Sequence, residues 1–348
     1  LGDFSRVDHR MHNKIMMVDN RTAIVGGRNL ADEYFGSHDD ANFRDMEVLT
    51  AGTIVQSLSR QFDAYWNSDW SFPVDRVVIV QPTRTPEEFE TWILANAARG
   101  LNENMAMRLH AWQQVAQAAV AGEVIVFADT PATENPAAED EFPVQLQHEL
   151  IEWIEQADEE LILVSAYLIP TTELEQAIEQ AENRGVRVRI LTNSLRSNNH
   201  VAAHSAYRNH VHRLVGHGAE VHEVRVFAKD RELYMETPVG DKHLGLHSKL
   251  LLIDNNLSYI GSANLDPRSL RLNTEMGLLI KSSEFNKLLR EVVALDFHQR
   301  NAWYLQTQDD GSLIWMADDT VLDEQPAEST LQRLEDWFLS ILPIEDEM

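Results

Sequence analysis

The stretch His12-Asn-Lys-Ile-Met-Met-Val-Asp19 recurs 235 residues later as His247-Ser-Lys-Leu-Leu-Leu-Ile-Asp254. A second stretch follows each copy: Ala23-Ile-Val-Gly-Gly-Arg-Asn29 after the first and Ser258-Tyr-Ile-Gly-Ser-Ala-Asn264 after the second. His, Lys, Asp, Gly and Asn therefore stand at the same offsets in both copies. Copies this far apart in a chain of 348 residues indicate a duplicated domain rather than a solenoid.

Each copy has the pattern of a β-hairpin. Residues 14–19 and 249–254 are short apolar runs that end in a β-branched residue before the Asp. Two polar residues then fit the turn, and a second apolar run fits the return strand. Because such apolar strands are typical of a sheet covered on both faces, we expect both hairpins to lie in buried sheets.

The segment upstream of the second copy alternates between strands and helices. The pattern predicts strands at 124–128, 161–167 and 186–192 and helices at 144–158, 171–184 and 199–216. Alternation of this kind predicts an α/β sandwich with a largely parallel or mixed sheet.

The two copies differ in what precedes them. The second follows a long α/β segment, whereas eleven residues precede His12 and the chain begins with Leu1 rather than Met. We therefore expect the first domain to be truncated at its N-terminus. Residues 1–122 would hold its C-terminal part and bridging helices, in which Met105, Met107 and Trp112 are expected core residues. Residues 123–305 would form the second domain, and 306–348 a tail with an amphipathic helix.

The spacing of the motif residues favours chemistry on a phosphate. In His-x-Lys on a strand both side chains point to one face, so an imidazole and an ammonium can meet one phosphate. The Asp at the strand end, Asp19 or Asp254, could orient an imidazole. Asn29 and Asn264 could donate hydrogen bonds to phosphate oxygens. Two solvated strand ends would not explain why the same polar residues recur at the same offsets.

Composition narrows the function classes. With 29 basic and 56 acidic residues the net charge is −27, which argues against a sequence-independent nucleic-acid binder. There is no Cys, so disulfides and thiolate metal sites are excluded. No apolar run reaches the length of a membrane-spanning helix, and the start does not read as a secretory signal.

Together these motifs resemble the phospholipase D superfamily, whose signature His-x-Lys-x4-Asp, then Gly-Gly or Gly-Ser and Asn, both copies match. The resemblance implies two half-sites that meet at a domain interface, without a cofactor or metal. One His attacks phosphorus and forms a phosphohistidine, and the other protonates the leaving alkoxide. The resemblance favours His12 as the nucleophile. It also implies that Lys14, Lys249 and the two Asn stabilise the phosphoryl oxygens.

A matched pair of acids follows the motifs. Arg44-Asp-Met-Glu47 parallels Thr274-Glu-Met-Gly277, so Asp45 and Glu275 are candidates to orient the His of the opposite copy. The first copy carries five additional residues between its Asn and this acid.

A closer resemblance is to bacterial cardiolipin synthases of the type C group. The stretches that carry it include Val25-Gly-Gly-Arg-Asn-Leu-Ala-Asp-Glu-Tyr-Phe-Gly36, Phe43-Arg-Asp-Met-Glu47 and Ala263-Asn-Leu-Asp-Pro-Arg-Ser269. It implies transfer of a phosphatidyl group from phosphatidylethanolamine to phosphatidylglycerol, by an enzyme associated peripherally with the bacterial cytoplasmic membrane. A hydrolase of lipid or other phosphodiesters is the main alternative, and a catalytically inactive lipid-binding domain is a third.

Two weaker signals lie in the second half of the chain, at His204 and at residues 329–342. His204 follows a predicted strand end at which α/β sites open, so we hypothesise that it contacts substrate. Residues 329–342 have apolar side chains at helical spacing. This helix could contact a membrane, but its acidic polar face favours a helix docked on the second domain.

Overall fold

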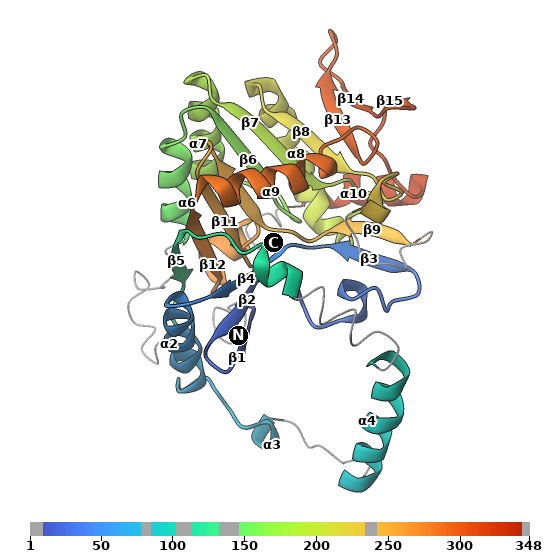
Figure 1. Cartoon of the computed structure of the whole chain (residues 1–348). Helices are drawn as coiled ribbons and strands as arrows, with labels where there is room; N and C mark the ends of the chain where they lie inside the picture. Colours follow the sequence, from blue (N-terminus) through green and yellow to red (C-terminus); the bar gives the residue numbers. More distant parts are fainter. Residues whose placement is uncertain (1–9, 78–84, 102–112, 132–145, 234–241, 343–348) are drawn as a thin grey trace, which may run out of the picture.

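The computed structural model describes residues 10–77, 85–101, 113–131, 146–233 and 242–342. The expected core residues Met105, Met107 and Trp112, and most of the loop after residue 131, lie outside the described residues. Within them the chain has an α/β fold in which both copies of the motif form antiparallel hairpins (Figure 1).

The second copy belongs to a ten-stranded mixed sheet. Strands β6, β7 and β8 are parallel, and every other pairing in this sheet is antiparallel. The predicted strands are present with shifts of one or a few residues at their ends. In sheet order the strands are β15 (Val321–Leu322), β14 (Leu313–Met316), β13 (Ala302–Thr307), β8 (Glu220–Val224), β7 (Arg187–Asn193), β6 (Glu160–Val164), β10 (Leu250–Ile253), β11 (Leu257–Gly261), β12 (Met276–Lys281) and β5 (Glu123–Ala128).

Helices cover both faces of this sheet, as an α/β sandwich requires. On one face α6 (Leu146–Glu155), α7 (Thr172–Asn183) and α8 (Val201–His217) build the larger core. On the other face α9 (Ser283–Asp296) contributes Leu289 and Val293 to a second core. Local hydrogen bonding and a glycine set the ends of α7. The Thr171 hydroxyl accepts from the Leu174 amide at its start, and Gly185, at φ +90°, follows its end.

The first copy forms a smaller sheet of three strands, β1 (Ile15–Val18), β2 (Thr22–Gly26) and β4 (Glu47–Ala51), followed by α2 (Ile54–Trp66). Here β1 is an edge strand, whereas the matching β10 is paired on both sides. As a result Met16 is 62% exposed and its counterpart Leu251 only 3%. The two hairpins thus match in sequence, but the second is buried more deeply than the first.

Three features join the two copies. The strands β3 (Ala41–Arg44) and β9 (His243–Leu246) form a parallel pair of their own. Buried Ala23 and Val25 of β2 share one core with Met276, Leu278 and Ile280 of β12. The Arg44 guanidinium also bonds the carboxylate of Asp296, on α9, in a buried pair. The copies therefore pack as one body around their hairpins.

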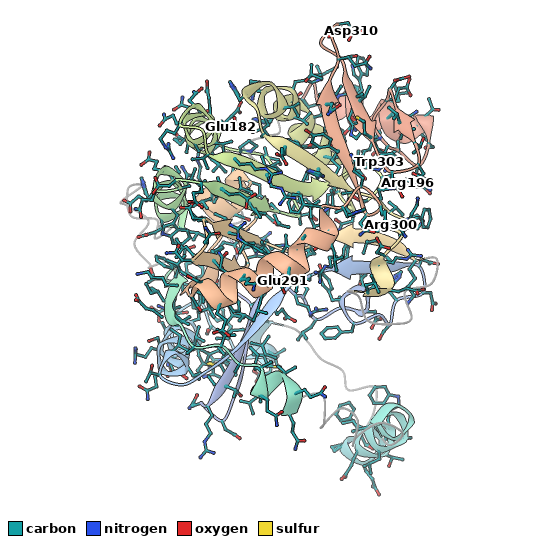
Figure 2. The ribbon with its side chains drawn as sticks, turned by 45° about the horizontal axis from the view of Figure 1, so that its top comes forward. Glu182, Arg196, Glu291, Arg300, Trp303 and Asp310 are labelled. Atoms are coloured by element: carbon teal, nitrogen blue, oxygen red, sulfur yellow. The ribbon has the colours of Figure 1, made fainter. Side chains whose placement is uncertain are left out.

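The remaining elements lie around these sheets. They are η1 (Asp32–Tyr34), α3 (Val74–Val77), α4 (Pro86–Leu101), η2 (Arg231–Leu233), η3 (Arg268–Leu272) and α10 (Thr330–Leu339). Strands β14 and β15, within the predicted tail, extend the large sheet, and Asp310 marks the tip of the projecting β13–β14 hairpin (Figure 2). None of the described helices is long and apolar enough to span a bilayer.

Candidate active site

The two motif histidines lie at the start of their hairpins. His12 precedes β1, and His247 lies between β9 and β10. The segment before His247 is held by Asn193, at the carboxyl end of β7, whose side chain bonds both the N–H and the C=O of Leu246 at 2.8 Å. His247 is thereby fixed at the edge of the sheet where ligands of parallel α/β sheets usually bind.

Each imidazole is hydrogen-bonded to a carboxylate from the opposite copy. Nδ1 of His247 lies 2.7 Å from Asp45, and Nδ1 of His12 lies 2.9 Å from both oxygens of Glu275. This is the cross-copy arrangement expected from the matched positions of the two acids. Because a carboxylate accepts, Nδ1 of each ring carries a proton, and Nε2 of each ring is the nitrogen left free for chemistry.

The backbone repeats the same exchange between copies. The His12 amide donates to the carbonyl of Thr274 at 2.9 Å, and the His247 amide donates to that of Arg44 at 2.8 Å. Each histidine is therefore held, through main chain and side chain, by the segment that carries its acid. Neither half-site is complete within one copy.

The two acids are buried and held by different groups. Glu275 accepts from the hydroxyl of Ser262 at 2.5 Å, and its amide donates to Asp129 at 2.8 Å. Asp45 instead accepts from the amide of Met46 at 2.7 Å. The repeat places a glycine, Gly27, where the second copy has Ser262. A Cβ at Gly27 would lie 2.9 Å from both the Asp45 carboxylate and the Lys249 side chain, so the close packing of this half-site requires the glycine.

Both motif lysines lie near Asp45 and Glu275, Lys249 fully buried and Lys14 half-buried. The Lys14 ammonium donates to the carbonyl of His12 at 2.8 Å, and that of Lys249 donates to the carbonyl of His247 at 2.5 Å. Burial lowers the pKa of each lysine to about 8, against the opposing pull of the acidic groups around them. An incoming phosphate would supply the anion that these desolvated ammonium groups favour.

The surroundings of His247 disfavour its charged form in the ligand-free protein. Burial, with the nearby Lys249 charge, lowers its pKa to about 4 even though Asp45 acts in the opposite direction. The ring also meets Tyr34 edge-on, with centroids 4.9 Å apart, and Phe43 at 5.8 Å. Sequence reasoning missed Tyr34 as a site residue, although it lies among the additional residues of the first copy.

The two motif asparagines are near these groups but are not equivalent. Asn29 donates to the Tyr34 hydroxyl at 2.9 Å. Asn264 is 5% exposed, and its carbonyl oxygen has no hydrogen-bond partner among the described residues. A buried amide oxygen of this kind is costly unless a ligand or water bonds it.

The predicted role of the motif aspartates as imidazole-orienting acids is wrong. Asp254 lies at the far end of β10, where it accepts from the amides of residues 158, 159 and 160 and holds the loop that enters β6. Asp19 lies exposed in the β1–β2 turn. A four-residue strand separates each Asp from the His-x-Lys end of its motif, and an extended strand advances about 3.3 Å per residue. Asp254 therefore holds a loop and Asp19 lies in a turn, while Asp45 and Glu275 bond the two rings.

The predicted substrate contact of His204 is also wrong. Its side chain is 2% exposed and lies under α10, where Nδ1 bonds Asp336 at 2.8 Å. The ring meets Tyr207 edge-on. His204 is thus a buried residue of the contact between α8 and α10, and the strand-end argument did not account for the helix that covers it.

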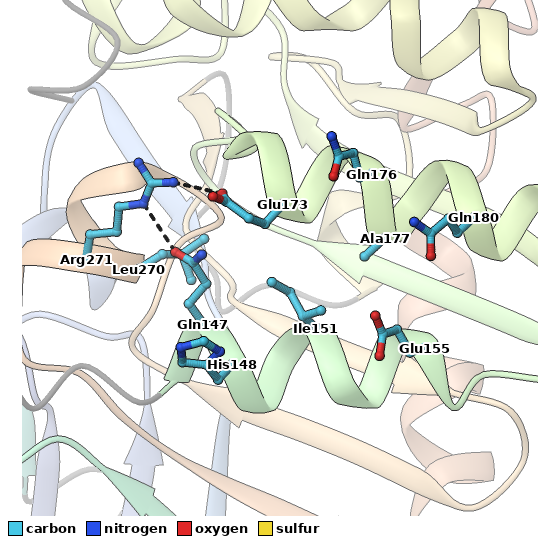
Figure 3. A pocket seen from close by; sticks show the side chains of 10 residues that line it. All are labelled: Gln147, His148, Ile151, Glu155, Glu173, Gln176, Ala177, Gln180, Leu270 and Arg271. Atoms are coloured by element: carbon cyan, nitrogen blue, oxygen red, sulfur yellow. Dashed lines mark hydrogen bonds and ion pairs between the residues drawn. The ribbon is translucent and has the colours of Figure 1, made fainter.

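A separate cavity of about 670 Å³ lies between α6 and α7 (Figure 3). Arg271 closes one end, with bonds to Glu173 at 2.8 Å and Gln147 at 3.4 Å. None of the histidines, lysines or acids described above lines it. The cavity belongs to the outer surface of the second copy.

Comparison with known proteins places this geometry in context. The family model "Cardiolipin synthase, PLD-like domain" matches residues 3–66 and 150–296. Cardiolipin synthase C of Escherichia coli K12 is 28% identical over 99% of this chain and 74% of its own length. Cardiolipin synthase B of the same organism is 27% identical over 86% of this chain, and an uncharacterized protein of Helicobacter pylori J99 is 29% identical over 88%. The chain spans 59% and 60% of the length of these last two proteins.

Among solved structures, the chain resembles phosphatidylserine synthase of Haemophilus influenzae Rd KW20. The TM-score is 0.61 at 16% identity, over 99% of this chain and 72% of that one. At this level of identity the likeness concerns the fold.

Proposed function

The chain belongs to the cardiolipin synthase family with a phospholipase D-like domain, and from this premise we propose that it is a phosphatidyltransferase. The proposed reaction moves a phosphatidyl group onto phosphatidylglycerol through a phosphohistidine intermediate, with phosphatidylethanolamine as donor. The observation that carries the proposal is the exchange of acids, in which Asp45 bonds His247 and Glu275 bonds His12.

The chemistry follows from these contacts. Nε2 of one histidine attacks phosphorus and the bond to the head-group oxygen breaks. The second histidine, which must carry a proton on Nε2 when the anionic phosphate is bound, gives that proton to the departing alkoxide. A hydroxyl of phosphatidylglycerol then gives its proton to that second histidine while its oxygen displaces the first from phosphorus. Lys14 and Lys249 stabilise the charge on the phosphoryl oxygens in both steps. The resemblance favours His12 as the nucleophile.

The proposed partners are phospholipids, so the protein must meet a bilayer surface, and we propose peripheral association with the bacterial cytoplasmic membrane. The acidic net charge makes nucleic acid an unsuitable substrate. Transfer and hydrolysis share the phosphohistidine step. The choice between them depends on whether an alcohol, rather than water, reaches the intermediate.

The test is a lipid analysis of cells that lack cardiolipin synthases and express the protein, beside His12→Ala and His247→Ala variants. We expect cardiolipin with the parent and none with either variant, because each half-site depends on the other. His298→Ala, on a histidine outside the site, is the matched control and should leave the product unchanged. Phosphatidic acid without cardiolipin would instead establish the hydrolase alternative. Cardiolipin at undiminished levels in either site variant would refute the shared site.

A further inference from the structure

The helix α10 turns a charged side chain toward the protein and its apolar side chains toward solvent, the reverse of an ordinary surface helix. Its Asp336 side chain is fully buried, whereas most of its apolar side chains face outward. A helix on a soluble domain normally buries its apolar stripe and exposes its charges. The exposed fractions are 73% for Leu331, 56% for Leu334, 50% for Trp337, 57% for Phe338 and 62% for Ile341.

Polar contacts hold α10 in this orientation. Asp336 bonds His204 at 2.8 Å and Arg208 at 2.9 Å, both on α8. Gln325, just before the helix, also donates to Asp336 at 3.1 Å. A buried carboxylate with three donors fixes the rotation of the helix, because any other face turned inward would leave Asp336 without them. The outward direction of the apolar face is therefore built into the fold.

The start of α10 packs against the loop after β7, at the edge of the large sheet that carries the candidate active site. Gln332 of α10 donates to the carbonyl of Leu195, and the amide of Arg196 donates to that of Pro326. Both contacts involve the loop that follows β7, whose last residue Asn193 holds the segment before His247.

Charge decides what this face can contact. Glu335 is exposed, while Arg333 is turned toward Glu324 and the carbonyl of Gln325. With a net charge of −27, an anionic surface would be repelled rather than attracted. An aromatic pair and long aliphatic side chains without an accompanying cation fit the interfacial layer of a bilayer through apolar insertion.

We propose that the outer face of α10 (Leu331, Leu334, Trp337, Phe338 and Ile341) inserts into a phospholipid bilayer and seats the active site on it. The inference deepens the proposed function, because it supplies the surface by which a lipid-processing site reaches its substrates. It commits to a bilayer rather than a second copy of the chain, since α10 starts at the edge of the sheet that carries the proposed lipid-processing site.

The first test is flotation of the full chain with vesicles of phosphatidylcholine, which measures binding without turnover. We expect the parent to float and the double variant Leu334→Glu/Phe338→Glu to need about a hundredfold more lipid, because each Leu or Phe moved out of water contributes roughly a factor of ten. Binding should not weaken at high salt, since insertion here is apolar. The matched control is Leu288→Glu/Val292→Glu, on half-exposed side chains of α9, which should float like the parent.

The second measurement separates this inference from the proposed function. With a short-chain phospholipid dissolved as monomers, the α10 variant should turn over the lipid as fast as the parent does. With the lipid in vesicles, the rate of the variant should fall below that of the parent. If the parent floats with vesicles but turns over no lipid, the proposed function is contradicted and the proposed bilayer contact of α10 is not. Flotation of the α10 variant at parental lipid concentrations, or a parent that is dimeric and becomes monomeric in that variant, would overturn the bilayer contact.

Discussion

At the scale of single residues, the site depends on carboxylates that lie outside the repeated His-x-Lys-x4-Asp stretch. Asp45 and Glu275 bond Nδ1 of the two imidazoles, while Asp254 bonds backbone amides at the other end of its strand. The acids of each copy therefore have different roles. Substitution of Asp45 or Glu275 should affect catalysis, and substitution of Asp254 should affect stability.

Replacement of Asp45 should damage catalysis more than folding. In Asp45→Asn the ring of His247 loses the acceptor that sets its tautomer, so we expect kcat to fall by roughly 10²–10⁴-fold. The Asp45 charge raises the pKa of His247, so its loss lowers that pKa further. The part of the kcat profile that His247 governs should then move to lower pH. A pH profile measured on monomeric substrate checks both effects.

Asp254→Ala is the matched control for that variant. It removes the acceptor of three backbone amides, so the free energy of unfolding should fall by about 1–3 kcal/mol. Below the melting temperature kcat should stay within a few-fold of the parent. If instead Asp254→Ala lost kcat as severely as Asp45→Asn while its stability held, the division of tasks would be wrong.

The lysines predict the alkaline limit of activity. Lys14 and Lys249 have pKa values lowered to about 8 in the free protein. As the pH rises through that value they lose the charges that hold a phosphate, so kcat/KM should decline above about pH 8. A guanidinium stays protonated, so Lys14→Arg should reduce the rate and make the decline less steep, because only Lys249 then loses its charge near pH 8. A flat profile up to pH 10 would contradict the role of these lysines.

At the scale of elements, the parallel pair of β3 and β9 links the two half-sites. Arg44 at the end of β3 pairs with buried Asp296 of α9, and burial raises the pKa of that carboxyl group. The next residue along the chain is Asp45, which bonds His247. The position of an orienting acid thus depends on an ion pair made with the opposite copy.

Removal of Arg44 should therefore affect stability and catalysis together. In Arg44→Met a buried carboxylate loses its partner, which costs about 3–5 kcal/mol. A second change, Asp296→Asn, removes the unpaired charge and should restore part of the loss. Urea unfolding of the single and double variants measures this coupling. If the single and double variants were equally stable, the Arg44–Asp296 ion pair would contribute nothing to the contact between the two copies.

At the scale of the whole molecule, the two copies share a core. Val25 of β2 packs in one cluster with Leu278 of β12, and both are fully buried. Sheets that share side chains in this way cannot separate without exposing apolar surface on both sides. The copies should therefore unfold together.

This cooperativity can be tested with one substitution in each copy. We expect Val25→Ala and Leu278→Ala each to shift a single calorimetric transition downward, because both deplete the same core by about 1–5 kcal/mol. Two separate transitions, each moved by only one of the variants, would show that the copies fold as independent domains.

The sequence by itself determined what depends on short-range pattern. Both hairpins and the alternating strands and helices of the second copy follow from periodicity and local hydrogen bonding. The exact repeat of His, Lys, Gly and Asn was also enough to identify the family. The matched positions of Asp45 and Glu275 identified the orienting acids, because a duplicated site must repeat its parts.

Tertiary structure alone decided several other contacts between segments that are distant along the chain. It assigned Asp254 to a loop, brought Tyr34 against His247, and buried His204 beneath α10. Spacing along the chain could not reveal these contacts, since each joins residues from elements that only packing places side by side. The same holds for α10: its apolar stripe is visible in the sequence, but the direction in which it faces is set by the donors that bury Asp336.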